Sequence, residues 1–276
     1  MDMRRVILIM MVMAALSACS PKPYVIVQVA DAQLGFTAAE NSRREGTEYV
    51  NDLTYEKDCL TEAVRLINEM SPDVVVFTGD QVNRSDNSEQ WEAFDDVISG
   101  IDRSVKVFHL PGNHDVRIDG TLVDSSPFTE RYGEDRFVHV DEGVRIIGIN
   151  TNLIKSGDPL EQAQFEWLKG ALGDSGSNEV KLVFGHHPFF MTDIDEEDSY
   201  FPVIRDKRRI YFDLFKDNGV TAVYAGHRHD NASSEYEGIP MRTTTSVAFQ
   251  IGKSKPSIRI MTIRNGRLYD ELKEIF

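Results

Sequence analysis

Five short polar motifs contain the side chains of this sequence that are best suited to chemistry. Three of them hold five of the chain's seven histidines, as Gly112-Asn113-His114-Asp115, Gly185-His186-His187-Pro188 and Gly226-His227-Arg228-His229. The other two supply carboxylates and an amide, as Asp31-Ala32-Gln33 and Gly79-Asp80. A single aspartate at a strand end is often only a turn or helix cap, but five such motifs in one chain favour a shared function.

The motifs offer carboxylate, amide and imidazole ligands and no thiolate. That ligand set suits borderline cations such as iron, manganese or zinc. Because none of the five motifs contains cysteine, they do not form a structural zinc finger. No single motif has enough ligands for a metal site, whereas all five together do. Two ions about 3.5–4 Å apart can clamp a phosphate group and activate a water molecule between them.

Each motif directly follows an apolar run that is typical of a β-strand. The spacing of apolar residues predicts helices over 55–70, 90–101, 160–172 and 207–218. In α/β proteins the loops at the carboxyl ends of strands form the ligand crevice, so the five motifs can meet in space. The predicted strands cover 24–30, 73–78, 105–110, 144–149, 180–184 and 220–225, with β-structure over 241–249, 257–263 and 267–272.

The order of the motifs, D-x-Q, G-D-x-x-N, G-N-H-D, G-H-H-P and G-H-x-H, resembles the calcineurin-like metallophosphoesterase family over residues 24–276. The resemblance implies one α/β domain built as a four-layer α/β/β/α sandwich, with two packed mixed β-sheets flanked by helices. It also implies hydrolysis of phosphate esters by water, with two ions of manganese, iron or zinc, and phosphomonoesters are favoured. A phosphodiesterase acting on cyclic nucleotides or other diesters is one alternative, and a non-catalytic module that binds a phosphorylated ligand is another.

The resemblance also assigns roles to individual residues. His114 would face the substrate phosphate, where it stabilises transition-state charge or protonates the leaving oxygen, and Asp115 would orient His114. His187 would either line the substrate pocket or pack in the interior. Two sets of four ligands would share Asp80 as a bridge: Asp31, Gln33, Asp80 and His229 for the first metal, and Asp80, Asn113, His186 and His227 for the second.

Gln33 departs from the usual pattern of the family, which has histidine at this position. An amide oxygen is generally a weaker ligand than imidazole for these metals, so we expect the first metal to be held more loosely. A narrower branch of the family carries D-x-Q here, and its eukaryotic member is regarded as a serine/threonine protein phosphatase.

The N-terminus resembles a bacterial lipoprotein signal. Arg4 and Arg5 precede an apolar run of eleven residues, which is shorter than the roughly 20 residues that a membrane-spanning helix needs. Leu16-Ser17-Ala18-Cys19 then resembles a lipobox. We therefore predict a signal peptide over 1–18, lipid on Cys19 and a tether over 19–23. An ordinary cleaved signal peptide and an uncleaved anchor helix are the alternatives.

The composition limits the partners. With a net charge of −15, the chain lacks the basic footprint that nucleic-acid binding needs. We expect a phosphorylated substrate, and contact with the bacterial membrane only through the lipid, on the periplasmic or the outer face of the envelope. If Cys19 carries lipid, Cys59 has no disulfide partner and is expected to be a buried apolar residue. The acidic run 193–198 is expected to be a solvated loop.

Overall fold

The computed structural model describes residues 22–173 and 179–276. The predicted signal peptide and Cys19, the predicted lipidation site, lie outside the described residues, as does most of the predicted tether. Within these two ranges, no helix has both the length and the apolar character that are needed to cross a membrane.

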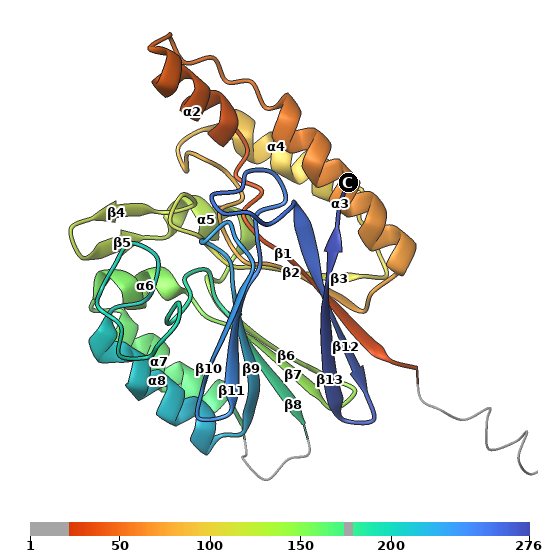
Figure 1. Ribbon diagram of the computed structural model, residues 1–276, viewed down its shortest axis with the longest axis vertical. Coiled ribbons are helices and arrows are strands. Elements are labelled where there is room, and N and C mark those ends of the chain that lie inside the picture. Colours follow the sequence, from red (N-terminus) through yellow and green to blue (C-terminus); the bar gives the residue numbers. More distant parts are fainter. Residues whose placement is uncertain (1–21, 174–178) are drawn as a thin grey trace, which may run out of the picture.

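A five-stranded mixed sheet forms one half of the fold (Figure 1). The three strands from the first half of the chain run parallel to one another. Of the two C-terminal strands, one pairs antiparallel with the first of these three, and the other pairs antiparallel with that C-terminal strand at the edge of the sheet. The first and last strands of the fold therefore belong to the same sheet. In spatial order the strands are β13 (Arg267–Glu274), β12 (Ser257–Arg264), β1 (Tyr24–Val29), β2 (Val74–Phe77) and β3 (Lys106–His109).

A six-stranded mixed sheet forms the other half. Its four inner strands are parallel, and both edge strands are antiparallel to their neighbours. In spatial order they are β10 (Ala232–Tyr236), β11 (Ile239–Thr243), β9 (Val220–Ala225), β8 (Val180–Phe184), β7 (Val144–Gly148) and β6 (Phe137–Asp141). A separate short hairpin consists of β4 (Arg117–Asp119) and β5 (Leu122–Asp124).

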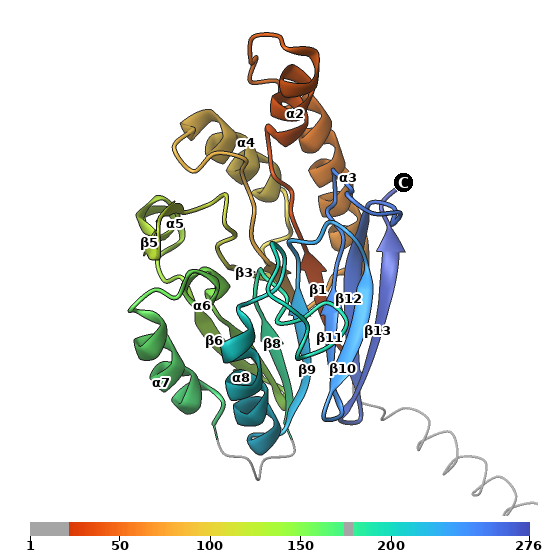
Figure 2. The ribbon, with the colours of Figure 1, turned by 60° about the vertical axis from the view of Figure 1, so that its left-hand side comes forward.

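Helices cover the outer face of each sheet (Figures 1 and 2). The first sheet is covered by α3 (Thr54–Met70) and α4 (Ser88–Ile98), and the second by α7 (Glu161–Ala171) and α8 (Arg205–Asp217). The expectation of two packed mixed sheets flanked by helices is confirmed. The remaining helices are α2 (Phe36–Glu45), α5 (Ser126–Tyr132) and α6 (Thr151–Ser156).

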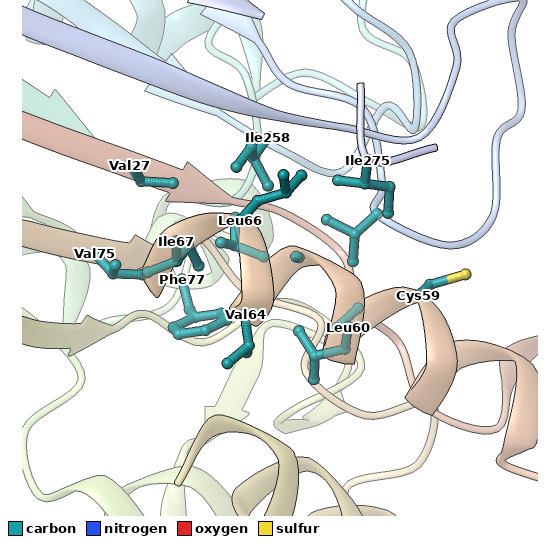
Figure 3. Close-up of a cluster of buried hydrophobic side chains, with 14 of the residues drawn as sticks. Val27, Cys59, Leu60, Val64, Leu66, Ile67, Val75, Phe77, Ile258 and Ile275 are labelled. Carbon is teal, nitrogen blue, oxygen red and sulfur yellow. The ribbon is translucent and has the colours of Figure 1, made fainter. Parts of the chain in front are cut away.

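Alternation along the strands divides the core into layers. Ile26 and Val76 point between the sheets and pack with Leu182 from β8, while the intervening Val27 and Val75 face α3 on the outside (Figure 3). Successive side chains of a strand point to opposite faces, so a strand that is apolar throughout fits this doubly covered position. Cys59 on α3 is buried, with 1% of its surface exposed, as expected.

The tail differs from the expectation in one stretch. We predicted β-structure over 241–249, but β11 ends at Thr243. Beyond it the side chains bond to other parts of the fold: the Thr244 hydroxyl donates to Gln28, and the Ser246 hydroxyl donates to the carbonyl of Asp31. The chain leaves the sheet here because these polar side chains attach it to β1 and to the first motif.

Candidate metal centre

The five motifs meet at one end of the two sheets, where the parallel strands end. The first two motifs are joined by hydrogen bonds from the Asp31 amide to Gly79 O (3.2 Å) and from the Gln33 amide to Asp80 O (2.7 Å). Contact between the sheets comes from the His227 amide, which donates to both carboxylate oxygens of Asp31 at 3.0 Å. Segments far apart in the sequence thus form a single group of loops.

Two glycines of the motifs are required by close approach. A Cβ on Gly112 would lie 2.1 Å from Oδ1 of Asp80, and a Cβ on Gly226 would lie 2.5 Å from Oδ2 of Asp31. These distances are below any normal contact, so the two carboxylates occupy the space that a side chain would need. Glycine in these motifs therefore lets the backbone pass beside a ligand.

The ligand residues have an unusual backbone conformation. Of the nine non-glycine residues with positive φ in the described ranges, five belong to the predicted ligand set. Positive φ costs a non-glycine residue of order 1–3 kcal/mol and persists where the surrounding structure enforces it, commonly at functional sites. The backbone thus marks the same residues as the motifs do: Asp31 (51°), Gln33 (44°), Asp80 (51°), His227 (64°) and His229 (51°).

The four ligands predicted for the second metal converge around His186. The Nδ1–H of His186 donates to Thr78 O at 2.9 Å, so in the neutral ring Nε2 carries a lone pair. That nitrogen lies 3.1 Å from Oδ1 of Asn113, 3.1 Å from Nδ1 of His227 and 3.4 Å from Oδ2 of Asp80. A metal ion, or a proton in its place, satisfies electron-pair donors that face one another at these distances.

The ligands predicted for the first metal lie beside this group. The Nδ1–H of His229 donates to Phe249 O at 2.6 Å, which leaves Nε2 of His229 3.5 Å from Oδ1 of Asp31. The amide oxygen of Gln33 is buried and has no hydrogen-bond partner in the described part of the chain. A buried acceptor without a partner is costly, and a metal ion would satisfy it. The residues present therefore fit both ions.

The electrostatics of the centre favour positive charge. Burial alone raises the pKa of Asp80, but the imidazoles of His186 and His114 outweigh burial and hold the pKa of that carboxyl well below its usual range. Burial lowers the pKa of His186, and Asp80 reverses this effect and raises it to about 9. Both shifts have the same cause, because buried carboxylates stabilise a cation next to them.

His114 lies at the edge of this centre. Its backbone amide donates to Oδ1 of Asp80 at 2.9 Å, and its Nδ1–H donates to the carbonyl of Asn83 at 2.8 Å. The ring is only half-buried, so Nε2 is the nitrogen left for a substrate. An imidazole held in this way can donate a proton or a hydrogen bond to a phosphate ester.

Asp115 binds backbone amides of two loops, whereas we expected it to orient the His114 ring. Its fully buried carboxylate accepts hydrogen bonds from the amides of Gly112 (2.8 Å), Gln81 (2.9 Å) and Val82 (3.2 Å). It thereby ties the second motif to the third. In the described residues the ring of His114 is instead oriented by the Asn83 carbonyl, to which its Nδ1–H donates.

Comparison with known proteins agrees with this geometry. The model of the calcineurin-like phosphoesterase domain matches residues 24–231. The chain belongs to the calcineurin-like phosphoesterase family. It is therefore a metal-dependent phosphoester hydrolase, and the buried side chains gathered here include candidate ligands for the dinuclear metal site of such an enzyme.

Individual members of the calcineurin-like phosphoesterase family are similar over most of the chain. Serine/threonine-protein phosphatase CPPED1 of Danio rerio is 30% identical over 261 residues, which cover 89% of this chain and 83% of the relative. The Homo sapiens protein of the same name is 27% identical, with 91% and 86% covered. A solved dimetal phosphatase from Danio rerio shares the fold, with a TM-score of 0.59 at 18% identity over 92% of this chain and all of that one.

Within this calcineurin-like phosphoesterase centre, a bound metal pair would supply Lewis acidity toward the phosphate and lower the pKa of a water molecule. The protein side chains have the other tasks. His114 presents Nε2 to the ester, and Asp115 fixes the two loops that carry Asp80 and Asn113. The prediction of this chemistry from the five motifs is confirmed at the level of the family.

His187 packs behind the ligands. It is 3% exposed, its ring centroid lies 4.3 Å from that of His227, and burial followed by the neighbouring His227 lowers its pKa well below the usual value. The Thr151 hydroxyl accepts hydrogen bonds from the backbone amides of His186 (3.1 Å) and His187 (2.8 Å). It donates a hydrogen bond to Nδ1 of His187 at 3.1 Å. Of the two expected positions, interior packing describes this ring.

Thr151 is a residue of the centre that the sequence analysis missed. It follows β7 at the same end of the sheet where the five motifs lie. The strand over 144–149 was predicted, so its carboxyl end was a signal that could have been used. Thr151 was overlooked because it is not a metal ligand.

Proposed function

We propose that the protein is a phosphatase for phosphomonoesters that uses two ions of manganese, iron or zinc. The observation that carries this proposal is the convergence of metal-ligating atoms around Nε2 of His186, beside a half-buried His114 ring whose Nδ1 is already bonded to Asn83. The name of the relatives, serine/threonine-protein phosphatase, favours monoesters over diesters as substrates.

The test is hydrolysis by purified protein supplied with each metal in turn. A phosphoserine peptide and 4-nitrophenyl phosphate represent monoesters, and bis(4-nitrophenyl) phosphate represents diesters. We expect turnover of the monoesters, its loss in His114→Ala, and slower turnover of the diester. A higher kcat/KM for the diester would overturn the preference, and two bound metals without turnover of any ester would support a binding module.

We also propose that the enzyme is held on the bacterial envelope by lipid on Cys19. This proposal rests on Leu16-Ser17-Ala18-Cys19 and the short apolar run before it. Membrane fractionation of cells that express the full chain tests it: the protein should partition with membranes, and Cys19→Ser should release it or leave the signal uncleaved. A soluble wild-type protein in the periplasm would point to an ordinary signal peptide.

A further inference from the structure

The segment between β8 and α8 lies beside the metal centre without forming a helix or strand over 188–204. Lys155, which is half-buried on α6, holds part of it. The Nζ of Lys155 donates to the carbonyls of Ser199 and Pro202, both at 2.6 Å. The two residues between these carbonyls, Tyr200 and Phe201, are therefore fixed from both sides.

A second cation holds the rest of this segment. Arg208 on α8 has no exposed surface. Its guanidinium donates to the carbonyls of Val203 (2.8 Å) and Glu196 (2.6 Å) and to the carboxylate of Asp198 (3.2 Å). Burying a guanidinium is unfavourable unless its donors are satisfied. Two cations are thus used to keep an irregular segment in one conformation.

The residues held in this way are aromatic and lie next to a metal ligand. The ring centroid of Tyr200 is 5.0 Å from that of His227, with an interplanar angle of 35°, and the ring of Phe201 is 5.6 Å from the same imidazole. Tyr200 nevertheless keeps 64% of its surface exposed. The ring therefore contacts His227 while most of the residue stays accessible to solvent.

A second aromatic pair lies beside His229. Phe36 packs on Phe249 with ring centroids 4.7 Å apart. Phe36 is also 6.1 Å from the ring of His229 and 6.4 Å from that of His114. An aromatic ring therefore also lies beside His114, the residue expected to face the ester.

The acidic run of the same segment adds little free charge to this surface. Asp195 pairs with Arg209, Glu197 pairs with Arg205, and Asp198 accepts from Arg208. The expectation of a solvated loop is met only in part, because these carboxylates are also paired with cations of α8. The side chains of this segment that contact the centre are therefore the aromatic rings of Tyr200 and Phe201, while the carboxylates are paired with arginines.

We propose that Tyr200 and Phe201 form a recognition surface for a planar ring that is attached to the substrate phosphate. The inference rests on the proposed phosphomonoesterase function and names the class of substrate: aryl phosphates and other monoesters that carry a ring close to phosphorus. Offset or tilted stacking on the exposed Tyr200 provides the contact. A phosphotyrosine side chain and a nucleoside monophosphate are two sources of such a ring.

Binding of non-hydrolysable phosphonates to the metal-loaded protein tests the proposal, because leaving-group reactivity then plays no part. Calorimetry compares phenylphosphonate with methylphosphonate. We expect the wild type to prefer the phenyl compound, and Tyr200→Ala to reduce that preference about 3- to 10-fold. Tyr200→Phe should keep it. An unchanged preference in Tyr200→Ala would overturn the proposal.

Tyr269→Ala is the matched control. Tyr269 is 55% exposed on β13 and pairs with Thr262, whose other partner is Val25 at the start of β1. It therefore lies at the end of the sheet away from Asp31, and its removal should leave the preference unchanged. Loss of the preference in this variant as well would show a general effect on the fold and count against the proposal.

Turnover identifies the source of the ring. Phosphotyrosine, adenosine 5′-monophosphate and phosphoserine are compared in the wild type and in Tyr200→Ala. A fall in kcat/KM for either ring-bearing ester relative to phosphoserine supports the proposal and names the source, and no relative fall for either contradicts it. Failure of the wild type to hydrolyse any monoester would refute the proposed phosphatase function, while the phosphonate result would still decide whether Tyr200 binds rings.

Discussion

Nε2 of His186 lies 3.1 Å from Nδ1 of His227, although the two residues are on different strand ends and the first ring already donates its Nδ1–H to Thr78. A proton on either nitrogen makes this a hydrogen bond, and a metal ion that displaces the proton would be bound by both imidazoles. This pair therefore brings two of the ligands predicted for the second metal within reach of one ion. Because Asp80 lies beside these two imidazoles, we expect its replacement to reduce metal binding.

Asp80→Asn should remove metal and activity together. Asp80 is buried with His186 and His114 around it, and an amide in its place keeps the shape without the negative charge. We expect metal content below one ion per chain and a fall in kcat/KM of at least about 100-fold. Elemental analysis and ester hydrolysis measure the two effects. Asp213→Asn, on the exposed side of α8, is the control, and equal metal loss there would argue against a specific role.

Gln33→His should tighten the first site. Imidazole binds borderline metals more strongly than an amide oxygen, and the Gln33 oxygen is already buried without a partner. We expect one ion to resist a chelator better, with a dissociation constant about 10-fold lower. Titration with a competing chelator measures this. Gln162→His, on the exposed face of α7, controls for an added surface histidine. If Gln33→His gave no gain, Gln33 would not be a ligand.

Asp115→Asn should reduce the stability of the protein and its metal affinity more than it impairs proton transfer by His114. An asparagine keeps one acceptor oxygen for the three amides that Asp115 binds, and it adds donors that face them. We expect a loss of about 2–3 kcal/mol in the free energy of unfolding and reduced metal affinity. Thermal unfolding and metal titration check this. A fall in kcat with stability and metal affinity intact would restore the role of direct orientation of His114.

His109 should make the protein sensitive to acid. Its ring stacks between Phe77 and Tyr132, and burial lowers its pKa to about 3 from an ordinary value of 6.5. The unfolded chain then binds a proton more readily than the folded one. The stability that depends on neutral His109 is full above about pH 6.5 and is lost as the pH falls toward 3, by up to about 1.4 kcal/mol per pH unit.

Urea unfolding between pH 7 and pH 4 measures this dependence. The variant His109→Phe keeps an aromatic ring in the stack and cannot be protonated, so its stability should fall less steeply than that of the wild type. The same slope in both proteins would show that other groups cause the acid sensitivity.

Lys155→Met should weaken ring recognition without removing metal. Two carbonyls lose their donor, so the segment with Tyr200 becomes less fixed. We expect a loss of about 1–2 kcal/mol in stability, a smaller preference for phenylphosphonate and unchanged metal content. Lys169→Met, an exposed lysine on α7, is the control. A preference equal to that of the wild type would show that the hydrogen bonds of Lys155 to Ser199 and Pro202 do not position Tyr200.

The elements that carry the motifs were predictable from apolar runs. The strands over 180–184 and 220–225 agree with β8 and β9, and the helix over 55–70 differs from α3 by one residue. Elements without a strong apolar pattern were missed. Helix α2 buries none of its residues, and β10 is a half-exposed edge strand with a polar sequence, so neither has the periodicity that marks burial.

The ligand set could be found because metal chemistry restricts residue types. The supports of the ligands could not, since backbone carbonyls of Thr78, Asn83 and Phe249 orient three of the histidines, and a carbonyl has no sequence signature. Nor does the sequence show that Lys155 and Arg208 serve the same segment. Such contacts depend on where the chain passes, which only the tertiary structure determines.

The left-handed conformation of five predicted ligands has a consequence for protein design. Copying the seven side chains onto another α/β scaffold would not reproduce this centre, because ordinary turns would aim Asp31, Asp80 and His229 in other directions. A design would have to copy each strand end together with its turn and, in the four motifs that contain one, its glycine. For the same reason, Gly112 and Gly226 should tolerate substitution as poorly as the ligands themselves, although they contribute no ligand atom.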